Sequence, residues 1–239
     1  MIGSKTYGVA KNTTLIAVKV IGDDNVAAGS SVLAGLNWVT NDIVTKSRLG
    51  SAVVNLSLGG PASSSMDNAV NALANRGILP VVAAGNDNQP AADVSPARAA
   101  NALCVGSVKS NDARSSTSNY GSAVDIWAPG GDIMSTWHTS NTATMTASGT
   151  SASAPFVAGL VSYLRGLEGQ SIGPAARARV LSLATVSDSS PTACETYTDF
   201  ANLDLAKSPY RCSRRTKPIG LQWKSLKAMV AIGSYFIHI

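Results

Sequence analysis

The sequence predicts an α/β fold, a doubly wound and mostly parallel sheet with helices on both faces. Two observations support this prediction. Short apolar runs rich in β-branched residues alternate with helical patterns over the first half of the chain, and turn residues such as Gly and Asn close the runs. A strand covered on both faces gives such an apolar run, and the helix between two parallel strands forms the right-handed crossover.

Three strands and two helices are expected in the first half. Residues 14–21 predict a strand buried on both faces, and 52–58 and 78–84 predict the next two. Between them lie two amphipathic helices, the second capped near Ser63 and ended by Gly77. The inward residues of the first helix are Val32, Leu36, Val39 and Ile43, and those of the second are Met66, Val70 and Leu73.

The second half continues the pattern less regularly. Further strands are expected at 103–108 and 123–128, and Pro174 begins a last helix. Residues 1–206 are therefore predicted to form one partial domain. Residues 207–239 show neither clean periodicity nor turn chemistry and stay unassigned, as a basic and apolar tail.

The charge of the chain argues against nucleic-acid binding. The net charge is +5, but seven cations follow the last acidic residue, Asp204, so that residues 1–206 hold 12 basic and 14 acidic side chains. The high pI thus belongs to the tail.

No membrane contact is expected either, because the apolar run 228–239 is shorter than the roughly 20 residues of a bilayer span. The first residues lack the apolar core of a signal peptide.

The spacing of the three cysteines fits neither a metal-binding motif nor a disulfide framework. Cys104 lies in an apolar run and is expected to be a buried small hydrophobic residue. Cys194 and Cys212 are a candidate disulfide pair in an oxidising compartment.

A loop that turns into a helix at residues 147–159 is the strongest candidate for chemistry. Gly149 allows a tight backbone, Thr150 or Ser151 can be the N-cap, and Pro155 suits the first turn. Free N–H groups at a helix N-terminus can hold an oxyanion, which makes Ser151 a candidate nucleophile. Taken alone, this local pattern favours a helix-capping role for the residue over a catalytic one.

Six segments follow one another in the chain as a recognisable set: 3–11, 55–60, 83–86, 118–121, 128–130 and 149–151. In this order they resemble the subtilisin-like serine proteases, and the proteinase K group of secreted fungal enzymes in particular. The resemblance covers the chain from residue 3 to about 170 and implies the subtilisin-like form of the predicted fold.

This resemblance implies roles for particular residues. Ser151 corresponds to the nucleophile and Asn86 to the side-chain donor of the oxyanion hole, whereas without the resemblance Asn86 is more simply a turn residue. Two further sets would bind a peptide or protein substrate, as a strand edge and as the wall of the P1 pocket. The edge is Ser57, Leu58 and Gly59, and the wall is Ala83, Ala84 and Gly85.

No cofactor is required by the resemblance, but a structural calcium is one expectation. Asp125 corresponds to a carboxylate that binds calcium in proteinase K together with backbone carbonyls. The loop near Ala100 and Ala102 departs from the family sequence, and a solvated or capping Asp is an equal alternative.

The family's catalytic Asp and His would precede residue 3, so the leading strand and the His helix are expected to be missing. Of the two histidines, His138 is expected to be a solvated loop residue and His238 a frayed end. The first hypothesis is thus a secreted, monomeric serine endopeptidase, truncated here and with negligible activity on its own. The alternatives are a non-catalytic pseudoprotease that binds peptides, and a product that does not fold stably because a sheet edge is exposed.

Overall fold

The computed structural model describes residues 1–169, 172–186, 198–199 and 233–238. Within these ranges, eight strands form one sheet in the order β1-β12-β2-β4-β6-β7-β11-β10. All neighbours are parallel except β10 and β11. The strands are β1 (Thr14–Lys19), β2 (Val53–Leu56), β4 (Leu79–Ala83), β6 (Leu103–Val108), β7 (Ile126–Pro129), β10 (Thr185–Val186), β11 (Thr198–Asp199) and β12 (Gly233–His238).

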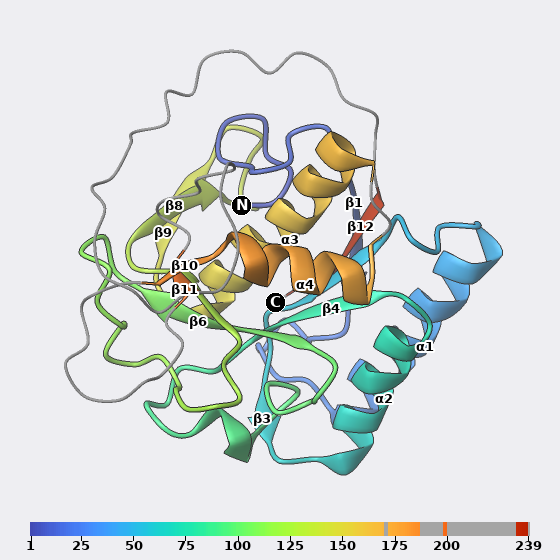
Figure 1. Cartoon of the computed structure of the whole chain (residues 1–239), viewed down its shortest axis with the longest axis horizontal. Coiled ribbons are helices and arrows are strands. Elements are labelled where there is room, and N and C mark those ends of the chain that lie inside the picture. Colours follow the sequence, from blue (N-terminus) through green and yellow to red (C-terminus); the bar gives the residue numbers. More distant parts are fainter. Residues whose placement is uncertain (170–171, 187–197, 200–232, 239) are drawn as a thin grey trace.

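Helices cover both faces of the sheet, which confirms the doubly wound architecture (Figure 1). α1 (Gly29–Thr45) and α2 (Ser64–Asn75) lie on one face, and α3 (Thr150–Glu168) and α4 (Pro174–Leu183) on the other. Smaller elements lie outside the main sheet: β3 (Gly60–Pro61), η1 (Ala91–Asp93), β5 (Val94–Ser95), β8 (Ile133–Thr136) and β9 (Thr144–Ala147). No helix within the described ranges combines the length and the apolar character that a bilayer crossing requires.

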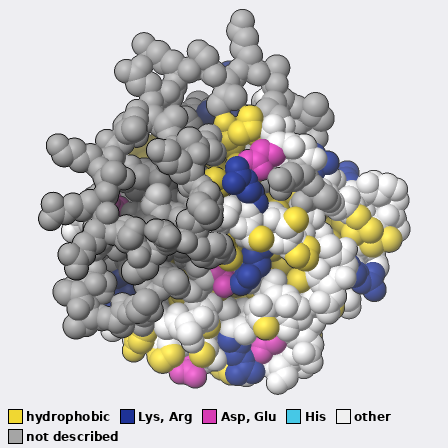
Figure 2. Space-filling model, viewed as in Figure 1, with side chains coloured by type: hydrophobic (Ala, Val, Ile, Leu, Met, Phe, Trp, Pro, Cys, Tyr) yellow, Lys and Arg dark blue, Asp and Glu magenta, His cyan; other side chains and the backbone are white. Residues whose placement is uncertain are grey.

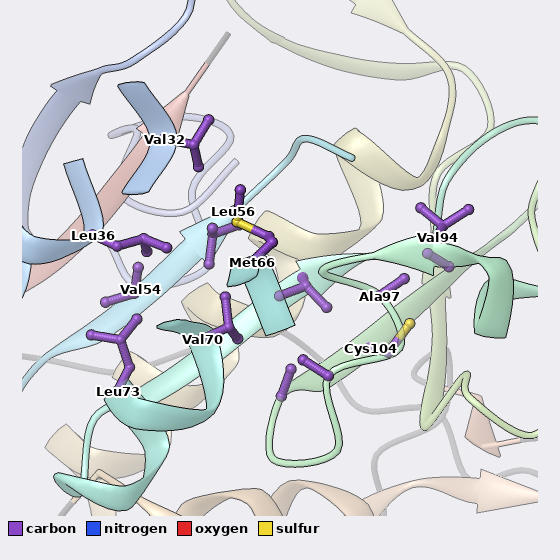
Figure 3. Packing of buried hydrophobic residues seen from close by; sticks show 14 of the residues in the cluster. Val32, Leu36, Val54, Leu56, Met66, Val70, Leu73, Val94, Ala97 and Cys104 are labelled. Carbon is purple, nitrogen blue, oxygen red and sulfur yellow. The ribbon is translucent and has the colours of Figure 1, made fainter. Parts of the chain in front are cut away.

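The core between the sheet and the first two helices contains the predicted apolar stripes. Val32 and Leu36 of α1 and Val70 and Leu73 of α2 point toward the sheet, where they meet Val54 and its neighbours (Figure 3). The side chain of Ser63 accepts a hydrogen bond from Met66 N at 3.4 Å and caps α2, as predicted. Alternate residues of β2 face the second core under α3, so this strand is buried throughout.

Strand β1 departs from the prediction. It lies at the edge of the sheet and is not buried on both faces. Ile16 and Val18 pack toward α1, but Leu15 on the opposite side is 48% exposed. Among the strands, α3 packs mainly on β2, β4, β6 and β7, and β1 lies beyond them in the sheet. The apolar run therefore predicted the strand correctly but wrongly predicted its burial on both faces.

The strand between β1 and β2 comes from the far end of the chain. Gly233–His238 pairs in parallel with Thr14–Lys19 on one side and with Val53–Leu56 on the other. Part of the unassigned tail therefore belongs to the sheet, and His238 is paired with Lys19 in the backbone register, not frayed. Cys194 and Cys212 lie outside the described residues, as does the predicted pairing between them.

The face that carries α3 and α4 has no large area of one charge among its described residues. Basic and acidic side chains lie beside one another, with apolar atoms between them (Figure 2). Two ion pairs of α4 join Arg177 to Asp125 and Arg179 to Glu168.

Candidate active site

Ser151 lies at the start of α3 but does not cap it. The helix begins at Thr150, and its N-cap is Gly149, with φ 131° and no side-chain capping bond. The prediction of Thr150 or Ser151 as N-cap was therefore wrong by one or two residues. Ser151 is half-buried at the N-terminal end of the helix, where backbone N–H groups lack intrahelical partners.

Gly149 lies where a side chain has little room. A Cβ atom there would be 3.1 Å from Asn86 Oδ1 and 3.2 Å from Asn86 Nδ2, and a φ of 131° already disfavours other residues. Gly149 N also donates to Gly130 O at 2.7 Å. The loop before the helix is thereby held against both neighbouring segments.

Pro155 lies inside the helix, not in its first turn as predicted. It is the sixth helical residue, and its missing N–H leaves Ser151 O without its usual partner four residues on. The hydroxyl of Ser57 donates to Ser151 O at 3.0 Å and satisfies it instead. Ser57 Oγ in turn accepts from Asn55 Nδ2 at 3.0 Å, so a chain of two hydrogen bonds joins β2 to the start of α3.

Asn86, on the loop after β4, is bound to the residue next to Ser151. Its Oδ1 accepts from Thr150 N at 2.8 Å and from Thr150 Oγ1 at 3.0 Å. Thr150 Oγ1 also accepts from Gly85 N at 3.1 Å. These bonds hold the carboxamide oxygen on the helix, so the NH₂ group is the part of Asn86 that remains for other acceptors. Among the described residues, none accepts a hydrogen bond from it.

The fully buried side chain of Asn119 shapes this loop. Its Nδ2 donates to Ala84 O at 2.8 Å, and its Oδ1 accepts from Asp87 N at 3.0 Å and Gln89 N at 3.1 Å. Gly85, with φ +101°, passes so close that a Cβ atom would lie 2.3 Å from Asn119 Nδ2. The sequence marked residues 118–121 only as part of a resemblance, and an Asn in a turn-rich segment gave no sign of this positioning role.

The two predicted substrate-binding sets flank Ser151 at the carboxyl ends of β2 and β4. Ala83 and Ala84 are buried and Gly85 is half-buried, while exposure increases from Ser57 through Leu58 to Gly59. A Cβ atom at Gly59 would lie 3.2 Å from a methyl group of Val94, so the segment runs close to β5. Their roles in substrate binding stay predictions.

The side chain of His138 does not lie beside Ser151. His138 is exposed in the turn of the β8–β9 hairpin and contacts the Trp137 ring, with 4.7 Å between ring centroids. The hairpin pairs Ile133 with Ala147 near α3 and Thr136 with Thr144 at its far end, roughly 10 Å away at a strand's rise per residue. Ser151 Oγ donates to Ser57 O at 3.4 Å, and no described titratable side chain bonds to it.

Asp125, the predicted calcium ligand, is bound by protein donors. Its Oδ2 accepts from Cys104 N at 2.8 Å, and its Oδ1 forms an ion pair with Arg177. Burial raises the pKa of Asp125 above its ordinary value, although the Cys104 N–H and the Arg177 charge oppose that effect. Cys104 itself is 1% exposed, which confirms the expectation of a buried thiol.

Comparisons with known proteins agree with this arrangement. A family model described as the Subtilase family matches residues 2–197. The chain is 56% identical over 184 residues to an alkaline proteinase of Hapsidospora chrysogena, a match covering 77% of this chain and 45% of the relative. It is 49% identical over 184 residues to the subtilisin-like serine protease AsES of Sarocladium strictum, covering 77% and 47%.

A solved structure shares the fold. The crystal structure of a cold adapted subtilisin-like serine proteinase matches with a TM-score of 0.74 and 38% identity, covering 83% of this chain and 70% of the other. The matched part of the chain spans about half the length of the curated relatives.

Proposed function

Because the chain belongs to the subtilase family, we propose that it carries the nucleophile and the oxyanion-binding groups of a serine endopeptidase. The observation that supports this most directly is the bond between Asn86 and Thr150. It places a neutral carboxamide beside the residue that precedes Ser151, at the N-terminus of α3. A peptide carbonyl between Ser151 Oγ and these donors would be attacked on carbon, and its oxygen would become the oxyanion.

Two donors are available for that oxyanion. One is the Asn86 NH₂ group, which is oriented by the bonds at Oδ1. The other is the backbone N–H of Ser151, for which no described group is an acceptor. In subtilisin, a member of the same family, loss of the corresponding asparagine lowers turnover about 10²- to 10³-fold, and we borrow that measured range for Asn86.

Turnover also requires a general base, which the described residues do not supply next to Ser151. An unassisted serine hydroxyl is a weak nucleophile, and in subtilisin removal of the histidine costs about 2 × 10⁶ in turnover. We therefore propose negligible peptidase activity for residues 1–239 alone. The complete enzyme would act outside the cell as a monomer on peptides or proteins with an apolar or aromatic P1 residue.

A second candidate function is peptide binding without catalysis. After β2 the chain becomes exposed at Gly59, and no described residue forms a backbone hydrogen bond with Leu58 or Gly59. Such groups can pair with an extended peptide whether or not the bond is cleaved. The two candidates therefore share a peptide-binding strand edge and differ only in the activation of Ser151.

Labelling with a fluorophosphonate probe tests the proposal. We expect slow phosphonylation of the 239-residue chain, no label on Ser151→Ala, and a further decrease in rate for Asn86→Ala. Ser182→Ala is a matched control, because Ser182 is an exposed helical serine remote from the site and its change should leave labelling unaltered. Label that persists on Ser151→Ala would refute the assignment of the nucleophile. Rapid labelling with hydrolysis of a chromogenic peptide would refute the proposed lack of activity, and peptide binding without labelling would favour the second candidate.

A further inference from the structure

The carboxylate of Asp125 lies just before β7, where it is bound by groups from two other elements of the chain. Its oxygens receive the backbone N–H of Cys104 in β6 and the guanidinium of Arg177 in α4. The same guanidinium donates through Nε to Ala102 O at 3.4 Å. One cation therefore bridges a carboxylate and a backbone carbonyl, which are hard oxygen ligands of the kind that calcium prefers.

Calcium does not fit this set of groups as it stands. The ion takes six to eight oxygen ligands, whereas here Asp125 is the only carboxylate and the described residues form no cluster of three potential metal-binding side chains. Both carboxylate oxygens already accept hydrogen bonds, and a dication at Oδ1 would be in contact with the positive charge of Arg177.

We propose that Arg177 is a built-in replacement for a structural metal ion, so that this part of the protein is stable without calcium. The guanidinium neutralises a carboxylate that is only 21% exposed, and it joins α4 to the segment that leads into β6. A structural metal at this position would make the same connection between the carboxylate and the carbonyl. Arginine suits it because its planar group donates in two directions at once.

The surroundings of Arg177 would admit a metal if the side chain were shortened. Arg177 forms part of the wall of an open cleft of about 250 Å³, which is also lined by Ala100, Asn101 and Pro174. Truncation at Cβ would connect this cleft with the Asp125 carboxylate and the Ala102 carbonyl. Water in the cleft can complete the coordination of a calcium ion. We therefore expect that Arg177→Ala converts the site from calcium-independent to calcium-binding.

Thermal unfolding of the 239-residue chain in EDTA and in calcium tests this inference. A matched control is Arg179→Ala on the same helix, because the Arg179–Glu168 pair has side-chain exposures of 30% and 20% against 31% and 21% for Arg177–Asp125. Arg177→Lys is a second control, since it keeps a cation at the position. The double variant Arg177→Ala/Asp125→Asn removes the carboxylate that the metal would need.

For wild type, Arg179→Ala and Arg177→Lys, the unfolding temperature of each protein should be the same in EDTA as in calcium. Arg177→Ala should unfold at a lower temperature in EDTA and gain about 3 to 10 °C in about 10 mM calcium, a range that assumes a weak site. The double variant should lose that gain.

Two results would overturn the inference. One is a calcium response of Arg177→Ala no larger than that of Arg179→Ala. The other is calorimetric calcium binding by the wild type that disappears in Asp125→Asn, which would show that the metal binds despite Arg177. The calorimetric comparison decides the question even if Arg177→Ala does not fold.

Discussion

Removal of the Ser57 hydroxyl tests how the start of α3 tolerates a proline. In the structure this hydroxyl donates to Ser151 O, which Pro155 leaves without an intrahelical partner, and accepts from Asn55 Nδ2. Ser57→Ala would therefore deprive two groups of their partners at once. The change also leaves the volume of the side chain almost unaltered, so that packing contributes little to the effect.

The expected cost follows from the burial of those two groups. Ser57 is 4% exposed and Asn55 is 1% exposed, while the bond to Ser151 O is partly buried. An unsatisfied buried donor or acceptor costs about 1 to 3 kcal/mol, and water can reach the carbonyl more easily than the amide. We expect Ser57→Ala to lower the free energy of unfolding by about 2 to 3 kcal/mol.

A double-mutant cycle with Pro155→Ala isolates the carbonyl. Alanine at 155 restores an N–H that can donate to Ser151 O, so the hydroxyl of Ser57 is no longer its only expected donor. The cost of Ser57→Ala should then be about 1 kcal/mol smaller in the Pro155→Ala background. Urea unfolding of the four proteins, followed by circular dichroism, measures this coupling.

Additivity within about 0.5 kcal/mol would refute the reasoning, because it would mean that Ser57 and Pro155 do not share the carbonyl. Ser63→Ala is the control. Ser63 caps α2 on the opposite face of the sheet and shares no partner with Pro155. Its cost, typically about 1 kcal/mol for a lost N-cap, should be the same in both backgrounds.

Three other predictions concern the loop, the thiol and the last strand. Asn119→Ala should lower the free energy of unfolding, measured in urea, by about 3 kcal/mol, because three backbone groups of the 84–89 segment lose their partner. The same change should slow fluorophosphonate labelling. Unchanged labelling would contradict the positioning role of Asn119. Cys104, with the other two cysteines replaced by Ser, should react with a maleimide at pH 8 only after unfolding, because burial, followed by the charge of Asp125, raises the pKa of the thiol. Reaction in the folded state would contradict this. Deletion of 233–238 should lower the unfolding free energy by at least about 4 kcal/mol, since both β1 and β2 lose a neighbour, and an unchanged urea midpoint would show that the strand is dispensable.

The elements near α1 and α2 were predictable because their signals are local. A stripe at helical spacing requires only that one face be buried, and Val39 and Ile43 are both fully buried as expected. The same is true of the buried strand at Leu79–Ala83. A local pattern cannot tell an edge strand from a central one, however, because both have apolar residues. This is why β1 was placed correctly along the chain and wrongly in the sheet.

The candidate site was predictable only where a motif specified a residue. Asn86 and Ser151 were identified by resemblance, and the structure brings their segments together through Thr150. The positioning roles of Asn119 and Ser57 were not predicted, since these residues act through bonds to backbone atoms 35 and 94 residues away. Hydrogen bonds to the backbone require no particular residue at the partner position. They therefore leave no pattern in a single sequence.

The anchoring of the first turns of α3 explains why the segments that contain Ser57, Asn86 and Gly130 meet at the start of this helix. A helix N-terminus that is to hold an oxyanion must leave the N–H group that faces it free, here that of Ser151, and a conventional side-chain cap would occupy this group. The structure compensates with contacts from outside the helix: Asn86 binds Thr150, Gly130 O binds the N-cap Gly149, and Ser57 binds Ser151 O. Each contact fixes the backbone around Ser151 while leaving the Ser151 N–H available. A variant that restores a conventional cap at Gly149 would thus compete with the oxyanion for the same donors.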